Sequence, residues 1–221
     1  MSILYIDSSA GVSGDMLLRA MLDLGLPAST VAQTLRVIAR ERSNRSDLPS
    51  PQMAGDLIRR IRQSRLKLDV KRKALRVWTL LAKAEGESHG CPWRRVHFHQ
   101  LGRPETMRNI LGFCAGLVYF RVDRVYTGPV PMGNLWRDPS GWLRRKPGPT
   151  ASHLLALSRL PVRMTGDSFE WTTPTGAALL AAFAAPDPPL LRILRIGHGA
   201  GRLRPPGDLR ALHILLAREC F

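Results

Sequence analysis

Short apolar runs typical of β-strands alternate with longer segments of helical spacing along this chain, and this alternation is its most constraining feature. Residues 2–6 form an apolar run that ends at Asp7, and residues 15–24 follow with apolar side chains at helical spacing. The same order continues, with strands expected at 95–99, 124–131 and 209–217 and helices at 28–41, 68–88, 105–118, 150–158 and 174–184. Strands that alternate with helices favour an α/β fold, here a layered mixed sheet with flanking helices.

The length of 221 residues predicts one domain with a substantial core. An apolar fraction of 44% argues against disorder, and no run approaches the roughly 18 uninterrupted apolar residues of a membrane span. The cysteines are odd in number and widely spaced, at Cys91, Cys114 and Cys220. This pattern argues against a disulfide framework and fits a reducing cytoplasm. We therefore expect a single cytoplasmic domain over residues 1–221, without membrane contact.

The net charge of +16 comes from 33 Lys+Arg and 17 Asp+Glu and first suggests a nucleic-acid partner. Much of the excess lies in the basic, mostly helical segment 28–88. Within it, residues 36–76 carry thirteen basic and four acidic side chains, a net charge of +9. Residues 36–76 contain no Phe, Tyr or Trp that could stack on bases. A mononucleotide or an acidic protein partner therefore fits this basic surface better than DNA or RNA does.

The loop between the first strand and the first helix reads Asp7-Ser-Ser-Ala-Gly-Val-Ser-Gly-Asp15 and is the first candidate site. Its glycines let backbone amides approach a ligand, and a helix N-terminus favours an anion or a phosphate. Open α/β sheets bind ligands at the carboxyl ends of their strands, which places Asp7 well for a metal or a ribose hydroxyl. The pattern matches neither the P-loop nor the dinucleotide fingerprint, so a purely structural loop is an equally supported interpretation.

His97 and His99 flank Phe98 in a segment that alternates like a strand. Both imidazoles then lie on one face, as two metal ligands require, while Phe98 enters the core. A nitrogen and oxygen site of this kind suits manganese, nickel or zinc, and three carboxylates could complete it: Asp7, Asp15 or Glu105. The alternative is a pair of hydrogen-bonded histidines on a half-exposed strand.

The other histidines and the cysteines give weaker signals. His89 and His198 each lie beside a glycine in an expected loop and are softer ligand candidates. Cys91 lies near His89 in sequence, but no recognisable catalytic-cysteine signature surrounds it. Cys114, in an apolar helix, is typical of a core residue.

Five segments, in the same order, resemble the LarC-type nickel-insertion protein family. They are residues 4–16 with 22–25, residues 89–90 with 96–102, residues 128–133, residues 170–178, and residues 196–201. Within the last of these we expect a glycine-rich loop at 197–201. The matches cover nearly the whole chain, and five in order are far more specific than any one alone.

This resemblance implies insertion of nickel into a pyridinium bis-thiocarboxylate mononucleotide, which yields a nickel-pincer nucleotide cofactor. The family's reaction is a cyclometallation that forms a carbon–nickel bond, and it depends on CTP and on a divalent ion such as manganese or magnesium. An active member would be a lyase-class chelatase with nickel as its substrate metal. The metal contacts expected here are His97, His99, Asp7, Asp15 and Glu105. The expected phosphate or nucleotide contacts are Ser8, Ser9, Gly11, Ser13, Gly14, Thr173, Thr175 and Gly176.

The sequence also departs from the family pattern. The family continues His-Phe-His with a glutamate and then two aspartates along the next helix, where this chain has Gln100, Glu105 and Asn109. An amide binds a divalent cation far more weakly than a carboxylate because it carries no charge. We also expect the chain to correspond to the first of the family's two domains, without the one associated with CTP.

Three interpretations follow from these matches and departures. The leading one is a short nickel-insertion protein that either works with a separate partner supplying the CTP-handling domain or has lost part of the activity. A second is a non-catalytic homologue that binds a nucleotide or an acidic protein partner. The third, nucleic-acid binding, rests on the net charge alone. A homo-oligomer is compatible with each.

Overall fold

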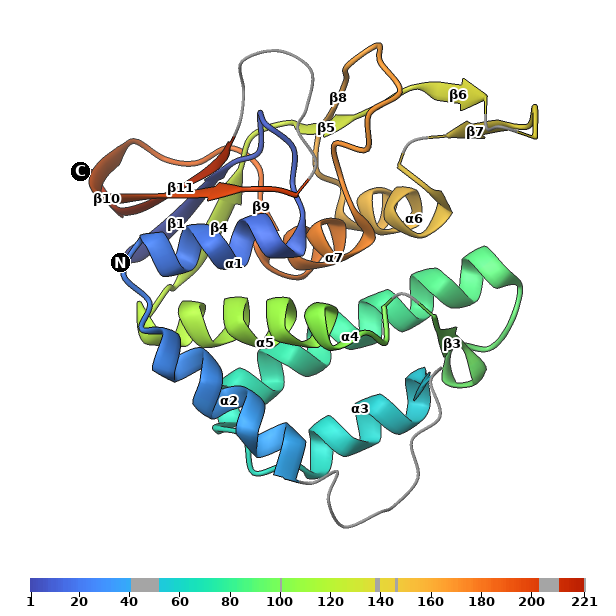
Figure 1. The fold of residues 1–221 in the computed structure, drawn as a ribbon. Coiled ribbons are helices and arrows are strands. Elements are labelled where there is room, and N and C mark those ends of the chain that lie inside the picture. The colour runs from blue at the N-terminus through green and yellow to red at the C-terminus, as the bar shows by residue number, and fades with distance from the viewer. Residues whose placement is uncertain (41–51, 100, 138–139, 146, 203–210, 221) are drawn as a thin grey trace.

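The computed structural model describes residues 1–40, 52–99, 101–137, 140–145, 147–202 and 211–220. Figure 1 shows a sheet on one side of the molecule and helices stacked beneath it. The helices are α1 (Gly14–Asp23), α2 (Ala28–Arg40), α3 (Ala54–Gln63), α4 (Leu68–His89), α5 (Pro104–Tyr119), α6 (Pro149–Ser158) and α7 (Pro174–Phe183), with a short 3-10 turn, η1 (Trp93–Arg95). None of the helices described is long and apolar enough to cross a membrane.

The main sheet is mixed, in the order β10-β11-β1-β4-β9. Its strands are β1 (Ser2–Asp7), β4 (Arg124–Thr127), β9 (Ala184–Ala185), β10 (Leu191–Ala200) and β11 (Ala211–Glu219). β1 pairs in parallel with β4 and antiparallel with β11, so the first and last strands are neighbours. This arrangement confirms the predicted α/β class with a mixed sheet and flanking helices.

In the part of the chain that the structure describes, three small two-stranded sheets lie outside the main sheet. They are β2 (Gln52–Met53) with β3 (His97–Phe98), β5 (Val130–Met132) with β8 (Val162–Met164), and β6 (Leu135–Arg137) with β7 (Leu143–Arg145). The expected strand at 95–99 is therefore only two residues long, because η1 occupies residues 93–95. The expected strand at 124–131 is split into β4 and β5 at Gly128-Pro129, where proline lacks the N–H that a continuous ladder requires.

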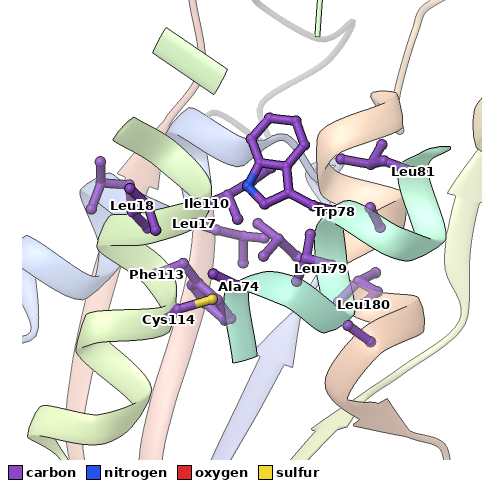
Figure 2. Packing of buried hydrophobic residues seen from close by; sticks show 14 of the residues in the cluster. Leu17, Leu18, Ala74, Trp78, Leu81, Ile110, Phe113, Cys114, Leu179 and Leu180 are labelled. Carbon is purple, nitrogen blue, oxygen red and sulfur yellow. The ribbon is translucent and has the colours of Figure 1, made fainter. Parts of the chain in front are cut away.

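The core lies where α1, α4, α5 and α7 meet, and Figure 2 shows their apolar side chains converging. Leu17 of α1, Trp78 of α4, Phe113 of α5 and Leu179 of α7 are all almost completely buried. Trp78 also contacts Phe98 of β3, with ring centroids 5.5 Å apart. Removing such side chains from water stabilises the fold by about 1.5–3 kcal/mol each, and here it fixes the helices that carry the candidate site.

The expected loop at 197–201 is wrong, because residues 191–200 form the strand β10. Gly197 and Gly199 lie against the backbone of α1: added Cβ atoms would stand 2.3 Å from the carbonyl oxygen of Ala20 and 1.9 Å from that of Met16, respectively. These glycines therefore permit close helix–strand packing, a role that sequence alone does not distinguish from a turn.

The end of α1 is tied to β10 by hydrogen bonds from His198 to Asp23. One carboxylate oxygen of Asp23 accepts from the backbone N–H of His198 at 2.8 Å and lies 3.1 Å from its Nδ1. The backbone hydrogen bond, followed by the ring contact, lowers the pKa of Asp23 below its ordinary value. This exposed pair fixes the register of α1 on the sheet at the end opposite the candidate site. The expected surface loop at 41–51 lies outside the described residues.

Candidate functional site

A cavity of about 650 Å³ gathers segments that are far apart in the sequence. Its lining comes from the loop before α1, the last turns of α4, the start of α5, the segment before α7 and the residues after β10. Four of the five segments that carry the family resemblance contribute to it. The remaining segment, 128–133, supports the site from outside, because the carbonyl oxygen of Pro131 accepts a 2.7 Å hydrogen bond from the buried hydroxyl of Thr172.

Three helices begin at this cavity: α1 at Gly14, α5 at Pro104 and α7 at Pro174. Ser13 caps α1 by accepting from the N–H of Met16, and Thr173 caps α7 by accepting from the N–H of Gly176. Helix N-termini carry partial positive charge and bind anions. Arg103 and Arg202 also line the cavity, so this part of it is suited to a phosphate.

Two buried oxygen atoms on the cavity wall have no hydrogen-bond partner among the residues that the structure describes. They are Oδ2 of Asp15 and Oδ1 of Asn109. The other carboxylate oxygen of Asp15 accepts from Ser13 Oγ at 2.6 Å, and Asn109 is only 8% exposed. Buried acceptors without partners are rare because they destabilise the fold. A cation or a ligand with donor hydrogens would satisfy both atoms, so the donors present fit a metal substrate.

The loop before α1 is docked on the segment before α7. The N–H of Val12 donates to Trp171 at 2.6 Å, and the carbonyl oxygen of Val12 accepts from Thr173 at 3.0 Å. Gly11 has a φ of +93°, and a Cβ there would stand 2.6 Å from the carbonyl oxygen of Trp171. A Cβ on Gly176 would stand 2.3 Å from the carbonyl oxygen of Val12. Both glycines thus serve the packing of the two loops.

The structure separates the five expected metal ligands into two groups. Asp15, His99 and Glu105 line the cavity, whereas Asp7 and His97 do not. Asp7 Oδ1 instead accepts hydrogen bonds from the backbone N–H and the hydroxyl of Ser9, which closes a turn. His97 is exposed and its ring centroid lies 6.5 Å from that of His99.

The eight expected phosphate or nucleotide contacts divide in the same way. Four of them line the cavity: Ser13, Gly14, Thr173 and Thr175. The other four are not part of its lining: Ser8, Ser9, Gly11 and Gly176. Ser8, for example, is buried with its hydroxyl 3.4 Å from that of Thr127. Gln100 lies outside the described residues. Lining the cavity does not by itself show that a residue binds a metal or a phosphate. The metal and phosphate assignments therefore stay predictions.

Several cavity residues were not singled out by sequence reasoning. Glu85 lines the cavity together with His89. The sequence signal for this pair is its i, i+4 spacing, which places both side chains on one face of a helix. Phe169 and Trp171 form an edge-to-face pair with centroids 5.2 Å apart, fixed by a hydrogen bond from Trp171 Nε1 to Asp167 at 2.8 Å. Their contribution depends on long-range packing that no local pattern shows. In the part of the chain described, no three His, Cys, Asp or Glu side chains stand together as a metal site.

Comparison with known proteins decides the family. The family model described as nickel insertion protein matches residues 4–219. This chain belongs to the nickel insertion protein family. A relative from Synechococcus sp. (strain JA-3-3Ab) is 35% identical over 230 residues, which cover 93% of this chain and 58% of the relative. One from Roseiflexus castenholzii is 32% identical over 94% of this chain and 58% of its own length.

A further relative, from Geobacter metallireducens, is 33% identical over 91% of this chain and 57% of its own length. All three carry the words nickel insertion protein in their names. The chain thus spans less than two thirds of the length of these nickel insertion proteins. No solved structure matches this chain.

Proposed function

We propose that this chain inserts nickel into a pyridinium bis-thiocarboxylate mononucleotide, as a step in making a nickel-pincer cofactor, and that metal and mononucleotide meet in the 650 Å³ cavity. The observation that carries the proposal is the convergence of four family segments on one cavity that offers both unpartnered acceptor oxygens and helix N-termini. The reaction is of the lyase class.

The metal side of the cavity is formed by Asp15, Asn109, Glu105 and His99. Carboxylate, amide and imidazole donors together suit a borderline divalent ion such as nickel. Because no three of the described acidic, histidine or cysteine side chains form a ready-made cluster, the protein supplies only part of the coordination shell. The thiocarboxylate sulfurs of the substrate supply the softer donors, so the metal is held strongly only when both substrates are present.

The mononucleotide side is formed by the starts of α1 and α7, with Ser13, Thr173 and Thr175, and by Arg103 and Arg202. Hydroxyl groups, helix N-termini and guanidinium groups are the common ligands of a phosphate. The aromatic pair at residues 169 and 171 borders the same space and offers a ring face to the pyridinium cation.

We propose that CTP and its manganese or magnesium ion are handled by a separate partner that corresponds to the family's CTP-associated domain. The nickel insertion proteins compared here match this chain over 57–58% of their own length. The three cysteines are free thiols, which agrees with a reducing cytoplasm.

The test is an insertion assay with nickel, the mononucleotide, CTP and manganese, read by mass spectrometry as the nickel isotope pattern on the product. It is run on the chain alone and with the added portion of the Synechococcus relative that the chain does not match. We expect product with the added portion, and a loss of about 10²-fold or more for Asp15→Ala. Absence of product under both conditions would favour a non-catalytic homologue that binds a nucleotide or an acidic partner.

A further inference from the structure

A row of three polar side chains from α4 and α6 reaches the cavity: Thr150, Glu85 and His89. None of the three is among the groups to which we assign the metal or the mononucleotide. Glu85 Oε2 lies 3.1 Å from His89 Nε2, one turn further along α4. The other carboxylate oxygen of Glu85 accepts from Thr150 Oγ1, at the start of α6, at 3.0 Å. Glu85 and His89 both line the cavity.

The burial of these groups distinguishes them from an ordinary surface ion pair. The side chain of Glu85 is 15% exposed, whereas that of His89 is 56% exposed, so the carboxylate is fixed and the imidazole remains accessible. A second helix contributes Thr150, which is buried and holds the carboxylate from the other side. An exposed i, i+4 pair on one helix has no such anchor.

This geometry orients the His89 ring. Nε2 faces the Glu85 carboxylate at 3.1 Å, so Nδ1 is the ring nitrogen that Glu85 does not engage and that can accept a proton when the imidazole is neutral. An imidazole that a carboxylate orients is the usual arrangement of a general base.

We infer that His89 is the base that accepts the ring proton when the carbon–nickel bond forms, and that Glu85 and Thr150 position it. The inference rests on the proposed function. In this step the ring C–H bond breaks, its electron pair becomes the carbon–nickel bond, and the proton moves to Nδ1 of His89. Nickel remains divalent, so the step needs neither an oxidant nor a reductant. The exposed side of the imidazole then returns the proton to water.

The experiment compares His89→Ala and Glu85→Gln with His153→Ala, which removes an exposed histidine on α6 that is not part of the cavity lining. Insertion rate is measured with the assay described above, and mononucleotide affinity is measured separately by calorimetry. We expect His89→Ala to lower the insertion rate about 10²–10⁴-fold while the Kd changes less than about twofold. Added imidazole should restore part of the rate. A substrate deuterated at the reacting carbon should show a larger isotope effect with His89→Ala than with the wild type.

Glu85→Gln should lower the rate less than His89→Ala and should respond less to imidazole, because the base is present but poorly oriented. Circular dichroism and thermal unfolding establish that each variant is folded. A wild-type insertion rate in His89→Ala would overturn the role of His89 alone. A parallel loss of rate and affinity would also overturn it, because His89 would then be a binding residue. Absence of product with the wild type would overturn the proposed function and this role together.

Discussion

Gly199 of β10 lies against the backbone carbonyl of Met16 on α1, so closely that a Cβ at position 199 would stand 1.9 Å from the carbonyl oxygen. Backbone atoms of a packed helix cannot move aside as the end of a flexible side chain can, so a larger residue must displace α1 from the sheet. The first turn of α1 also forms part of the cavity, through Gly14, Asp15 and Met16. The contact therefore positions the cavity wall.

Gly199→Ala should lower the free energy of unfolding by about 1–3 kcal/mol or more, because the added methyl group overpacks this contact. Urea denaturation measures the change. Gly148→Ala is the matched control, since a Cβ there would meet nothing within 4 Å, and its effect should be about 1 kcal/mol or less as a weakened N-cap. Equal effects of the two substitutions would show that the contact is not tight in solution.

Asn109→Asp should raise nickel affinity about tenfold or more, because it adds a negative charge to the cavity wall that also carries the unpartnered oxygen of Asp15. Without metal the same substitution should lower the thermal unfolding temperature, because it places a charged carboxylate at a buried position. Calorimetry and thermal unfolding with and without nickel measure both effects. Unchanged nickel affinity would argue against a metal at this part of the cavity.

His99→Ala should weaken nickel binding in the presence of the mononucleotide more than His97→Ala does. The reason is position, since His99 lines the cavity and His97 does not. Metal content after gel filtration distinguishes the two variants. Equal losses would favour the ligand pair that the sequence alone predicts, with both imidazoles on one metal.

Cys114 should resist alkylation in the folded protein. Burial raises the pKa of its thiol to about 12, although the nearby charge of Lys73 acts in the opposite direction. At pH 8 the reactive thiolate is therefore almost absent, whereas Cys220 is exposed. Mass spectrometry after iodoacetamide treatment should show label on Cys220 and none on Cys114 until denaturant is added. Native labelling of both at the same rate would contradict the packing of α5.

The same shift has a consequence for stability in alkaline solution. An unfolded thiol ionises near its ordinary pKa, about 8.5, before the folded thiol does. The stability associated with Cys114 is therefore complete below that pH and is lost as the pH rises toward about 12. Cys114→Ala should reduce this part of the pH dependence, as followed by urea denaturation between pH 8 and 10.

The helices could be predicted from sequence because their signals are local. For example, α4 ends at His89, and Gly90 adopts a φ of +63° that glycine tolerates best. The alternation at 95–99 also predicts that Phe98, between His97 and His99, is buried, and it is. It does not show that, of these two histidines, His99 alone lines the cavity, because that depends on how β3 packs against α4.

Long-range packing explains the other differences. The segment around Gly197 resembles a loop in composition, yet its glycines allow a strand to approach α1. The anchor of Glu85 is Thr150, 65 residues away in the sequence, so no spacing rule connects them. From the sequence, Asn109 is only an amide at a position where the family pattern has a carboxylate. The structure adds that its oxygen is buried on the cavity wall and has no partner among the described residues.

The most direct test of the central claim is to locate the metal. Crystals grown with nickel and the mononucleotide would be measured at the nickel absorption edge, and an anomalous difference map would show where nickel lies. We predict one strong peak in the cavity beside Asp15 and Asn109, with the phosphate toward the starts of α1 and α7. A peak outside this cavity, or none with the mononucleotide bound, would contradict the account.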